Sequence, residues 1–202
     1  MNARIFPVLA AALFVAACAS GGRDRTGPAI YDLGPVPAPA SAAVIGLTDL
    51  SGLAVEVRLP VWLDGAAMRY RLAYAEPLRL HAYAHARWAS PPTQLLQQRL
   101  RQQLTLAALP APCTLRVELD DFSQSFASPA ASAGVLRGEA LLFGKGQKTG
   151  ARLPLRIEVP AASADAVGGA GALAIGADRL AEKLAGWLKD QDLAACRGAG
   201  RV

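Results

Sequence analysis

The 202-residue sequence carries little charge, since only 18% of its residues are Asp, Glu, Lys or Arg. Disordered chains, long charged tails and coiled coils carry more charge and fewer apolar residues than this sequence, of which 52% is hydrophobic. We therefore expect a folded chain, and its length predicts a single domain. Because 43 of the hydrophobic residues are Ala, we expect the 29 Leu, with Val and Ile, to supply the core.

Runs of basic residues are absent as well. The net charge is +5, but the 21 Lys and Arg residues are scattered along the chain. A protein that binds nucleic acid usually gathers its basic residues into a patch or stripe that contacts the phosphates. Nucleic-acid binding is therefore not expected.

Histidine is scarce, and His81 and His85 are the only two. A spacing of four would place both rings on one side of a helix, as a metal pair requires. This segment instead alternates like a strand, in which four residues separate two side chains by roughly 13 Å. We therefore interpret the two histidines as part of a polar strand face, and we predict no metal site.

Signatures of catalysis and cofactor binding are also lacking. No Ser lies in a nucleophile elbow, and the carboxylates are dispersed, so a secreted hydrolase has no triad to support it. The segment Gly169–Gly171 resembles a dinucleotide-binding loop only loosely. Its small residues are better interpreted as allowing a helix to pack closely on a sheet. We predict no enzyme activity and no cofactor.

The N-terminus has the pattern of a lipoprotein signal. Residues 1–4 form a short, positively charged segment, and Ile5–Ala17 is an apolar stretch too short to span a bilayer. Val15–Cys18 matches a bacterial lipobox, which predicts that residues 1–17 are a signal peptide and that Cys18 is lipidated. Residue 19 is Ala, not the Asp that signals inner-membrane retention, which favours the periplasmic face of the outer membrane. Ordinary secretion with a chance Cys is the alternative.

Beyond Cys18, two cysteines remain, Cys113 and Cys196. In an oxidising periplasm they have one pairing available, which predicts a disulfide between the start of a strand and the segment after the last helix. The chain-entropy estimate for such a long loop is roughly 4 to 5 kcal/mol. Two buried free thiols are the alternative.

The mature chain divides into a tether, residues 18–29, and one α/β domain, residues 30–202. Period-two alternation predicts two segments that could form a hairpin, then a long strand with a register break near Asp121 and an antiparallel pair. Two amphipathic helices are expected, one starting at a Ser90 N-cap and ending at Leu109, the other running from Asp165 to Lys189. We expect Asp178 to lie off the apolar face of the second helix. The expected strands are Val44–Leu50, Val55–Leu59, Met68–Tyr74, Leu78–Trp88, Leu115–Phe126, Val135–Phe143 and Leu153–Val159.

A series of short motifs resembles one known family. The motifs are the lipobox, Tyr31 with Leu33, Leu63-Asp64, Met68-Arg69-Tyr70-Arg71, Arg87-Trp88-Ala89 with Pro92 and Leu95, Phe122 with Phe126, and Trp187-Leu188. In this order and spacing they resemble the ABC-type transport auxiliary lipoprotein family, which includes PqiC-like proteins. The resemblance implies a single α/β domain with a mixed sheet and helices on both faces, similar to anticodon-binding-like and TolB amino-terminal folds.

The resemblance also implies partners but no catalytic residues. It implies an Mce-domain protein and the permease and ATPase of an ABC transporter, which together move lipids or other hydrophobic molecules between membranes. The leading hypothesis is a non-enzymatic adaptor anchored in the outer membrane. The alternative is a lipoprotein that itself carries a lipid or other apolar ligand, for which an apolar pocket of a few hundred Å³ would be needed. Homo-oligomerisation stays open.

Overall fold

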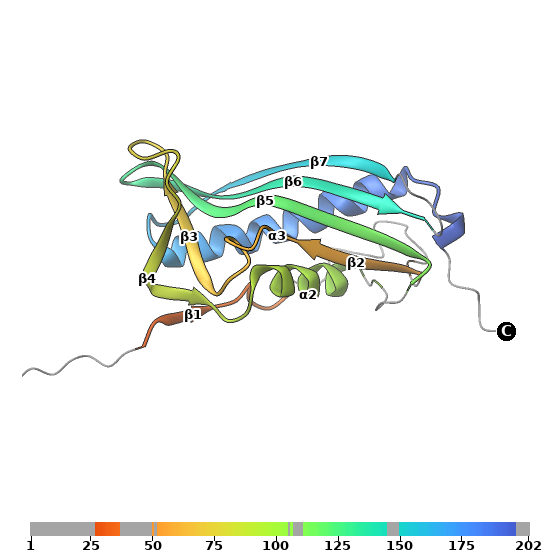
Figure 1. Ribbon diagram of the computed structural model, residues 1–202, viewed down its shortest axis with the longest axis horizontal. Helices are drawn as coiled ribbons and strands as arrows, with labels where there is room; N and C mark the ends of the chain where they lie inside the picture. The colour runs from red at the N-terminus through yellow and green to blue at the C-terminus, as the bar shows by residue number, and fades with distance from the viewer. Residues whose placement is uncertain are drawn as a thin grey trace, which may run out of the picture.

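The computed structural model describes residues 27–36, 50, 52–104, 106, 111–144 and 150–196. The signal peptide, Cys18 and most of the tether lie outside these residues, as does nearly all of the strand expected over Val44–Leu50. The described residues form one mixed α/β domain, whose elements are shown in Figure 1.

The elements follow the expected order. They are β1 (Ala29–Tyr31), β2 (Leu53–Arg58), β3 (Ala67–Leu72), β4 (His81–Trp88), α2 (Pro92–Leu104), β5 (Cys113–Ser128), β6 (Ala131–Phe143), β7 (Ala151–Pro160), α3 (Ala166–Lys189) and the 3-10 helix η1 (Ala194–Cys196). The predicted hairpin is β3 with β4, and the predicted antiparallel pair is β6 with β7. Strand β1 was not expected, because its three residues form a strand only through their pairing with β4.

The long strand β5 organises the sheet. One of its edges pairs with β6 along nearly the whole strand, antiparallel. Its other edge is shared: β2 pairs in parallel with Cys113–Glu118, and β3 pairs in parallel with Gln124–Phe126. The remaining neighbours give the order β1-β4-β3-β5-β6-β7, with β2 beside β5. The sheet is therefore mixed, as predicted.

A bulge bends β5 near its middle. The pairing of β5 with β6 shifts register between Leu119 and Asp121, which confirms the predicted break. Opposite the bulge, Gly138 has a φ of +150°, and a side chain there would collide with the backbone of Glu118. Only glycine fits both requirements.

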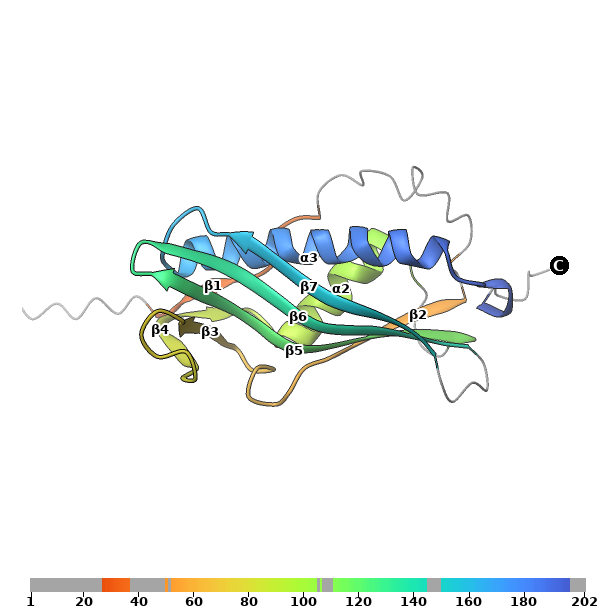
Figure 2. The same cartoon turned by 90° about the horizontal axis from the view of Figure 1, so that it is seen from above.

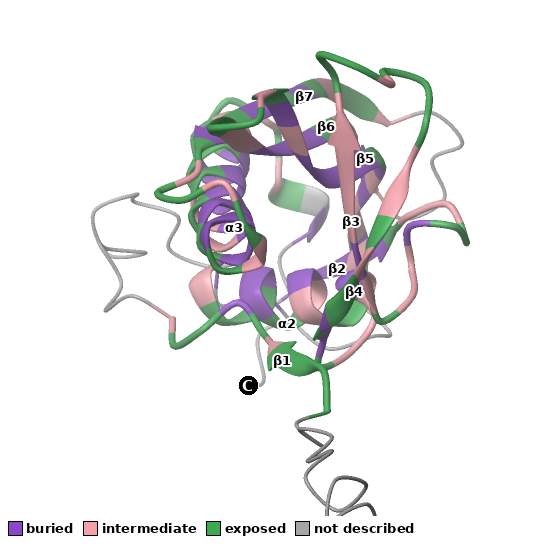
Figure 3. Cartoon of the chain, turned by 90° about the vertical axis from the view of Figure 1, so that its left-hand side faces the viewer, coloured by how far each residue is buried: buried purple, intermediate pink, exposed green. Residues whose placement is uncertain are grey.

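Both helices lie on the same face of the sheet, so the implied arrangement with helices on both faces is wrong (Figure 3). The helices contact each other, while α3 packs on β6 and β7 and α2 packs on β2. The reason lies in the strands, whose outward positions are polar: Arg116 and Glu118 on β5 and Arg152 and Arg156 on β7 are exposed or half-buried. Only one face of the sheet is apolar enough to bury a helix.

Helix α3 follows its predicted apolar stripe closely, since Leu173, Leu180, Leu184 and Leu188 are all buried. Its N-cap is Asp165, whose carboxylate accepts hydrogen bonds from the Gly168 N–H at 2.8 Å and the Ser163 hydroxyl at 2.6 Å. These two donors hold the pKa of Asp165 below its usual range, because they stabilise the charged form.

Helix α2 is capped from outside its own segment. Ser90 was expected to cap it, but the Ser90 hydroxyl bonds the side chain of Gln94 instead. The backbone N–H and the hydroxyl of Thr93 donate to Asp64 at 3.1 Å and 2.8 Å. A carboxylate there satisfies a free donor of the first turn and fits the helix dipole. The β2–β3 loop that carries Asp64 is thereby fixed to the start of α2.

An ion pair buried between the two helices joins them. The guanidinium of Arg99, on α2, is only 4% exposed and binds both carboxylate oxygens of Asp178, on α3, at 2.8 Å and 3.0 Å. The Gln103 amide also donates to Asp178, and Arg99 donates to the Gly34 carbonyl at 3.0 Å. From its place on the helix, Asp178 was expected to lie away from the packed surface. It instead lies where α3 packs against α2.

We predict that Arg99→Ala lowers the free energy of unfolding by about 2–3 kcal/mol, because the Asp178 carboxylate, which is 22% exposed, loses its charged partner and keeps the Gln103 amide. Urea denaturation followed by circular dichroism measures this. Arg101→Ala, on the exposed side of the same helix, is the matched control and should change stability by about 0.5 kcal/mol or less. Equal effects of the two substitutions would contradict the assigned role of the pair.

Candidate partner interface

The loop between β2 and β3, residues 59–66, is held rigidly at both of its sides. The carbonyl of Pro60 accepts from the N–H groups of Leu63 and Asp64 at 2.9 Å and 3.0 Å, which closes a turn. The Leu63 side chain is buried in the domain, and Asp64 is bonded to Thr93. The turn therefore has little freedom to move against the body of the domain.

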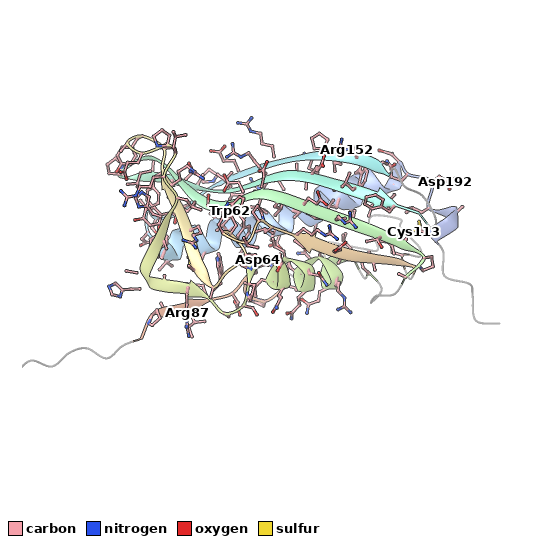
Figure 4. The ribbon with its side chains drawn as sticks, viewed as in Figure 1. Trp62, Asp64, Arg87, Cys113, Arg152 and Asp192 are labelled. Carbon is pink, nitrogen blue, oxygen red and sulfur yellow. A yellow bond between two sulfur atoms is a disulfide. The ribbon has the colours of Figure 1, made fainter. Side chains whose placement is uncertain are left out.

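At the tip of this turn, two large apolar side chains face solvent. Val61 is 87% exposed and Trp62 is 62% exposed. Figure 4 labels Trp62 near Asp64, in the part of the view between β5 and α2. Trp is the residue type most enriched among the contacts that dominate protein interfaces, because it buries a large area with few rotatable bonds. A rigid turn that presents Val61 and Trp62 is suited to bind another protein.

A groove of about 560 Å³ opens beside this turn on the polar face of the sheet. It is lined by Arg58, Leu59, Pro60, Glu118, Leu119, Asp120, Gly138 and Glu139. Three of these residues are carboxylates and one is a cation, and Arg58 is itself paired with Glu56 at 2.7 Å. Glu139 is in turn paired with Arg152 at 2.7 Å, and Glu118 lies 3.8 Å from Arg116, so the groove offers a partner polar contacts next to Trp62 without a large excess of either charge.

Glu56 neutralises two arginines at the margin of the groove. Burial by itself would raise the pKa of Glu56, but hydrogen bonds from Arg116 and Arg58 bring the pKa below its usual range. The carboxylate is thus charged at neutral pH and holds both guanidinium groups in place.

A smaller pocket of about 110 Å³ lies farther along the same face. It is lined by Arg71, Arg137 and Arg156, together with Asp121 and Glu158 among others. Arg137 binds the buried carboxylate of Asp121 at 2.7 Å, and this hydrogen bond raises the pKa of Arg137. The charges of the lining are nearly balanced. The pair of Arg137 and Asp121 stabilises the bulged region of β5, and we assign no separate function to the pocket.

A third hollow, of about 360 Å³, lies between β1 and the first turns of α3. Most of its lining is apolar, with Ile30, Tyr31 and Leu33 on one side and small residues such as Ala170, Gly171 and Ala174 on the other. The hollow is open to solvent and lies beside β1, which Figure 1 shows at one end of the domain.

The two histidines take separate positions on β4. The ring of His81 stacks on Tyr70 with centroids 5.0 Å apart, and its Nε2 lies 3.0 Å from a carboxylate oxygen of Glu76. His85 is exposed. Within the part of the chain that the structure describes, no three His, Cys, Asp or Glu side chains form a group that could hold a metal ion.

The glycine-rich start of α3 has a packing role, as interpreted from the sequence. A side chain at Gly169 would collide with the amide of Gln124, which is buried and accepts a hydrogen bond from the Tyr83 hydroxyl at 2.7 Å. Burial in this cluster raises the pKa of Tyr83, so its hydroxyl remains a donor. Gly169 thus lets α3 approach the polar network beneath it.

At the opposite end from the tether, Cys113 and Cys196 are bonded in the structure, with Cα atoms 5.2 Å apart. Cys113 begins β5 and Cys196 ends η1, and both are buried. The bond joins the sheet to the segment that follows α3. This separation lies within the range that disulfides require.

We predict that the same disulfide forms in the cell envelope. Non-reducing peptide mapping of the protein isolated from envelopes should yield one linked peptide containing Cys113 and Cys196. Cys113→Ala should lower the free energy of unfolding by about 2–5 kcal/mol, and adding Cys196→Ala should lower it little further, because the first substitution already removes the crosslink. Alkylation of both thiols without prior reduction would show that the bond is absent.

Sequence reasoning did not identify Val61 and Trp62. The available signal was a pair of large apolar residues between Pro60 and Gly65, where a turn exposes side chains. Only the structure shows that neighbouring Leu63 turns inward while Trp62 does not. Cys18, the predicted lipidation site, lies outside the described residues, and its role stays a prediction.

Comparison with known proteins gives one family and a shared fold. A family model described as the ABC-type transport auxiliary lipoprotein component matches residues 31–185. The crystal structure of protein XCC0632 from Xanthomonas campestris, assigned to family DUF330, is similar with a TM-score of 0.68 and 19% identity, covering 79% of this chain and 93% of that chain. The crystal structure of an uncharacterized protein is similar with a TM-score of 0.62 and 22% identity, and the match covers 80% of this chain and 99% of that chain. No curated protein matches significantly.

Proposed function

Because the chain belongs to the ABC-type transport auxiliary lipoprotein family, we propose that it is a non-enzymatic adaptor of an Mce/ABC-type lipid-transport system, anchored on the periplasmic face of the outer membrane. The match to residues 31–185 carries the proposal, since it includes nearly the whole described domain. The family description itself connects the chain with lipoproteins and ABC-type transport.

The surface of the domain supports an adaptor. An adaptor needs a rigid surface that a partner can bury, and the turn with Val61 and Trp62 beside the carboxylate-lined groove meets this need. The partner we propose is the Mce-domain conduit that connects the transporter with the outer membrane. The permease and ATPase act through that conduit.

The anchor completes the proposal. Cys18 in its lipobox would carry two or three acyl chains, which are enough for stable membrane binding. Neither of the two α-helices among the described residues is long and apolar enough to cross a membrane.

We predict that Cys18→Ser abolishes lipidation of residue 18 and cleavage of the signal peptide by the lipoprotein signal peptidase. Mass spectrometry of the wild-type N-terminal peptide should find acyl chains on Cys18, and fractionation of the envelope should find the protein in the outer membrane. A wild-type N-terminal peptide without acyl chains would contradict the anchor. Wild-type protein in the inner-membrane fraction would contradict the assignment to the outer membrane.

Crosslinking in intact envelopes tests the partner. Trp62→Asp should reduce crosslinks to the Mce-domain protein by about tenfold or more, because an Asp cannot fill an apolar pocket and adds a charge that must be desolvated. Ile175→Asp, at an exposed apolar position on α3, is the matched control. Recovery of no Mce or ABC component with the wild-type protein, together with turnover of a substrate by the purified domain, would favour an enzyme instead.

The apolar hollow between β1 and α3 favours a second function, binding of a lipid or another apolar ligand. Its volume is in the range of small-molecule sites, although it is open to solvent where such sites usually enclose their ligand. Organic extraction of the protein purified from envelopes distinguishes the two functions. A carrier would yield a stoichiometric lipid beyond the anchor itself, and an adaptor would not.

A further inference from the structure

Four of the seven large apolar side chains that the described residues expose lie at one end of the domain. Ile30 on β1, Tyr74 and Leu78 in the β3–β4 loop, and Val167 in the first turn of α3 are exposed, and Leu78 is 95% exposed. Figure 3 looks straight at this end, where the β3–β4 loop, β4, β1 and the start of α3 all face the viewer. We call these four side chains the apolar end.

The surface between these side chains is mixed, with small apolar residues among polar ones such as the exposed His85. Strand β4 crosses the end and presents Ala82 and Ala84 to solvent, and the β5–β6 turn adds exposed Pro129 and Ala130. The apolar hollow between β1 and α3 opens here as well, with Ile30 and Val167 among its lining residues. Burial of such a surface is favourable wherever water is excluded from it.

The chain outside the structure leads to the same end. Gly27, at the start of the described residues, precedes β1, and Cys18 lies nine positions before it. Nine residues span at most about 32 Å when fully extended. A domain tethered by acyl chains on Cys18 is therefore held within that distance of the bilayer, with the apolar end beside the point where the tether enters.

One basic side chain at this end is available to a lipid phosphate. Arg87 on β4 is exposed, points away from the domain in Figure 4, and forms no ion pair with any described residue. Arg79 is exposed beside Leu78 and pairs with Glu76 at 3.1 Å, and Glu76 also lies beside His81. Two further carboxylates lie at this end: Asp165 accepts hydrogen bonds from the Gly168 N–H and the Ser163 hydroxyl, and the exposed Asp32 accepts one from the Gly34 N–H at 2.7 Å.

We propose that the apolar end docks on the surface of the anchoring bilayer, with Leu78, Tyr74, Ile30 and Val167 in the interfacial region and Arg87 at the lipid phosphates. The proposal rests on the proposed function in one respect, the lipid anchor at Cys18. It adds an orientation: the domain rests on the membrane by one end, and Trp62 faces sideways into the periplasm. Tyr is well suited to such a boundary, because its ring is apolar and its hydroxyl is polar.

Depth-sensitive fluorescence on the mature protein purified from envelopes tests this orientation. A bimane label is placed at Leu78→Cys and at Val167→Cys, with Val61→Cys as the matched control, an equally exposed apolar position on the β2–β3 loop. Each protein is reconstituted into vesicles of phosphatidylethanolamine and phosphatidylglycerol, with and without brominated acyl chains. We expect a blue shift and loss of emission by bromine quenching at positions 78 and 167, and neither at position 61.

Equal quenching at all three positions, or none at 78 and 167 in protein that floats with the vesicles, would overturn the docking proposal while leaving the anchor intact. The anchor is tested separately by the mass of the N-terminal peptide. If Cys18 carries no lipid and positions 78 and 167 are still quenched, docking stands and the anchor fails. Protein that neither floats nor shows quenching overturns docking.

Discussion

The buried pair of Arg99 and Asp178 is the contact on which the arrangement of the domain depends. Because the sheet has one apolar face, both helices must lie on it and meet side by side. Their meeting point contains a guanidinium bound to two carboxylate oxygens and to the Gly34 carbonyl. A bidentate pair fixes the rotation of each helix more strictly than Leu side chains do, since it tolerates little change in angle. Through Gly34 it also positions the segment that follows β1.

Small residues make this close arrangement of helix and sheet feasible. A Cβ at Gly134 would collide with the backbone of Ala172, and one at Gly176 would press on Leu136, so α3 lies almost directly on β6. The Ala residues of α3 that face the sheet are buried too, among them Ala177 and Ala185. The high Ala content of the sequence thus has a structural use: it gives a dense core with few large side chains.

The surfaces left over by this packing differ in character. The outward face of the sheet is charged and largely paired within itself, as in the contacts of Glu56 with Arg58 and Arg116. Most of the large apolar side chains that remain exposed lie in the Trp62 turn or at the end next to β1, and Ile175 on α3 is a further one. An adaptor held at a bilayer by one end and presenting a rigid aromatic turn sideways can contact lipid and protein at once, because the two surfaces do not overlap.

The sequence by itself determined the features that depend on near neighbours along the chain. Alternation predicted the strands and the break near Asp121, helical periodicity predicted the leucine stripe of α3, and the motif series identified the family. The tertiary structure decided the rest. Asp64 caps a helix 29 positions away, and Asp178 pairs with a residue 79 positions away. Ile30, Leu78 and Val167 share one end of the domain only after folding. Periodicity assigns residues to faces, but which faces meet depends on how the chain closes on itself.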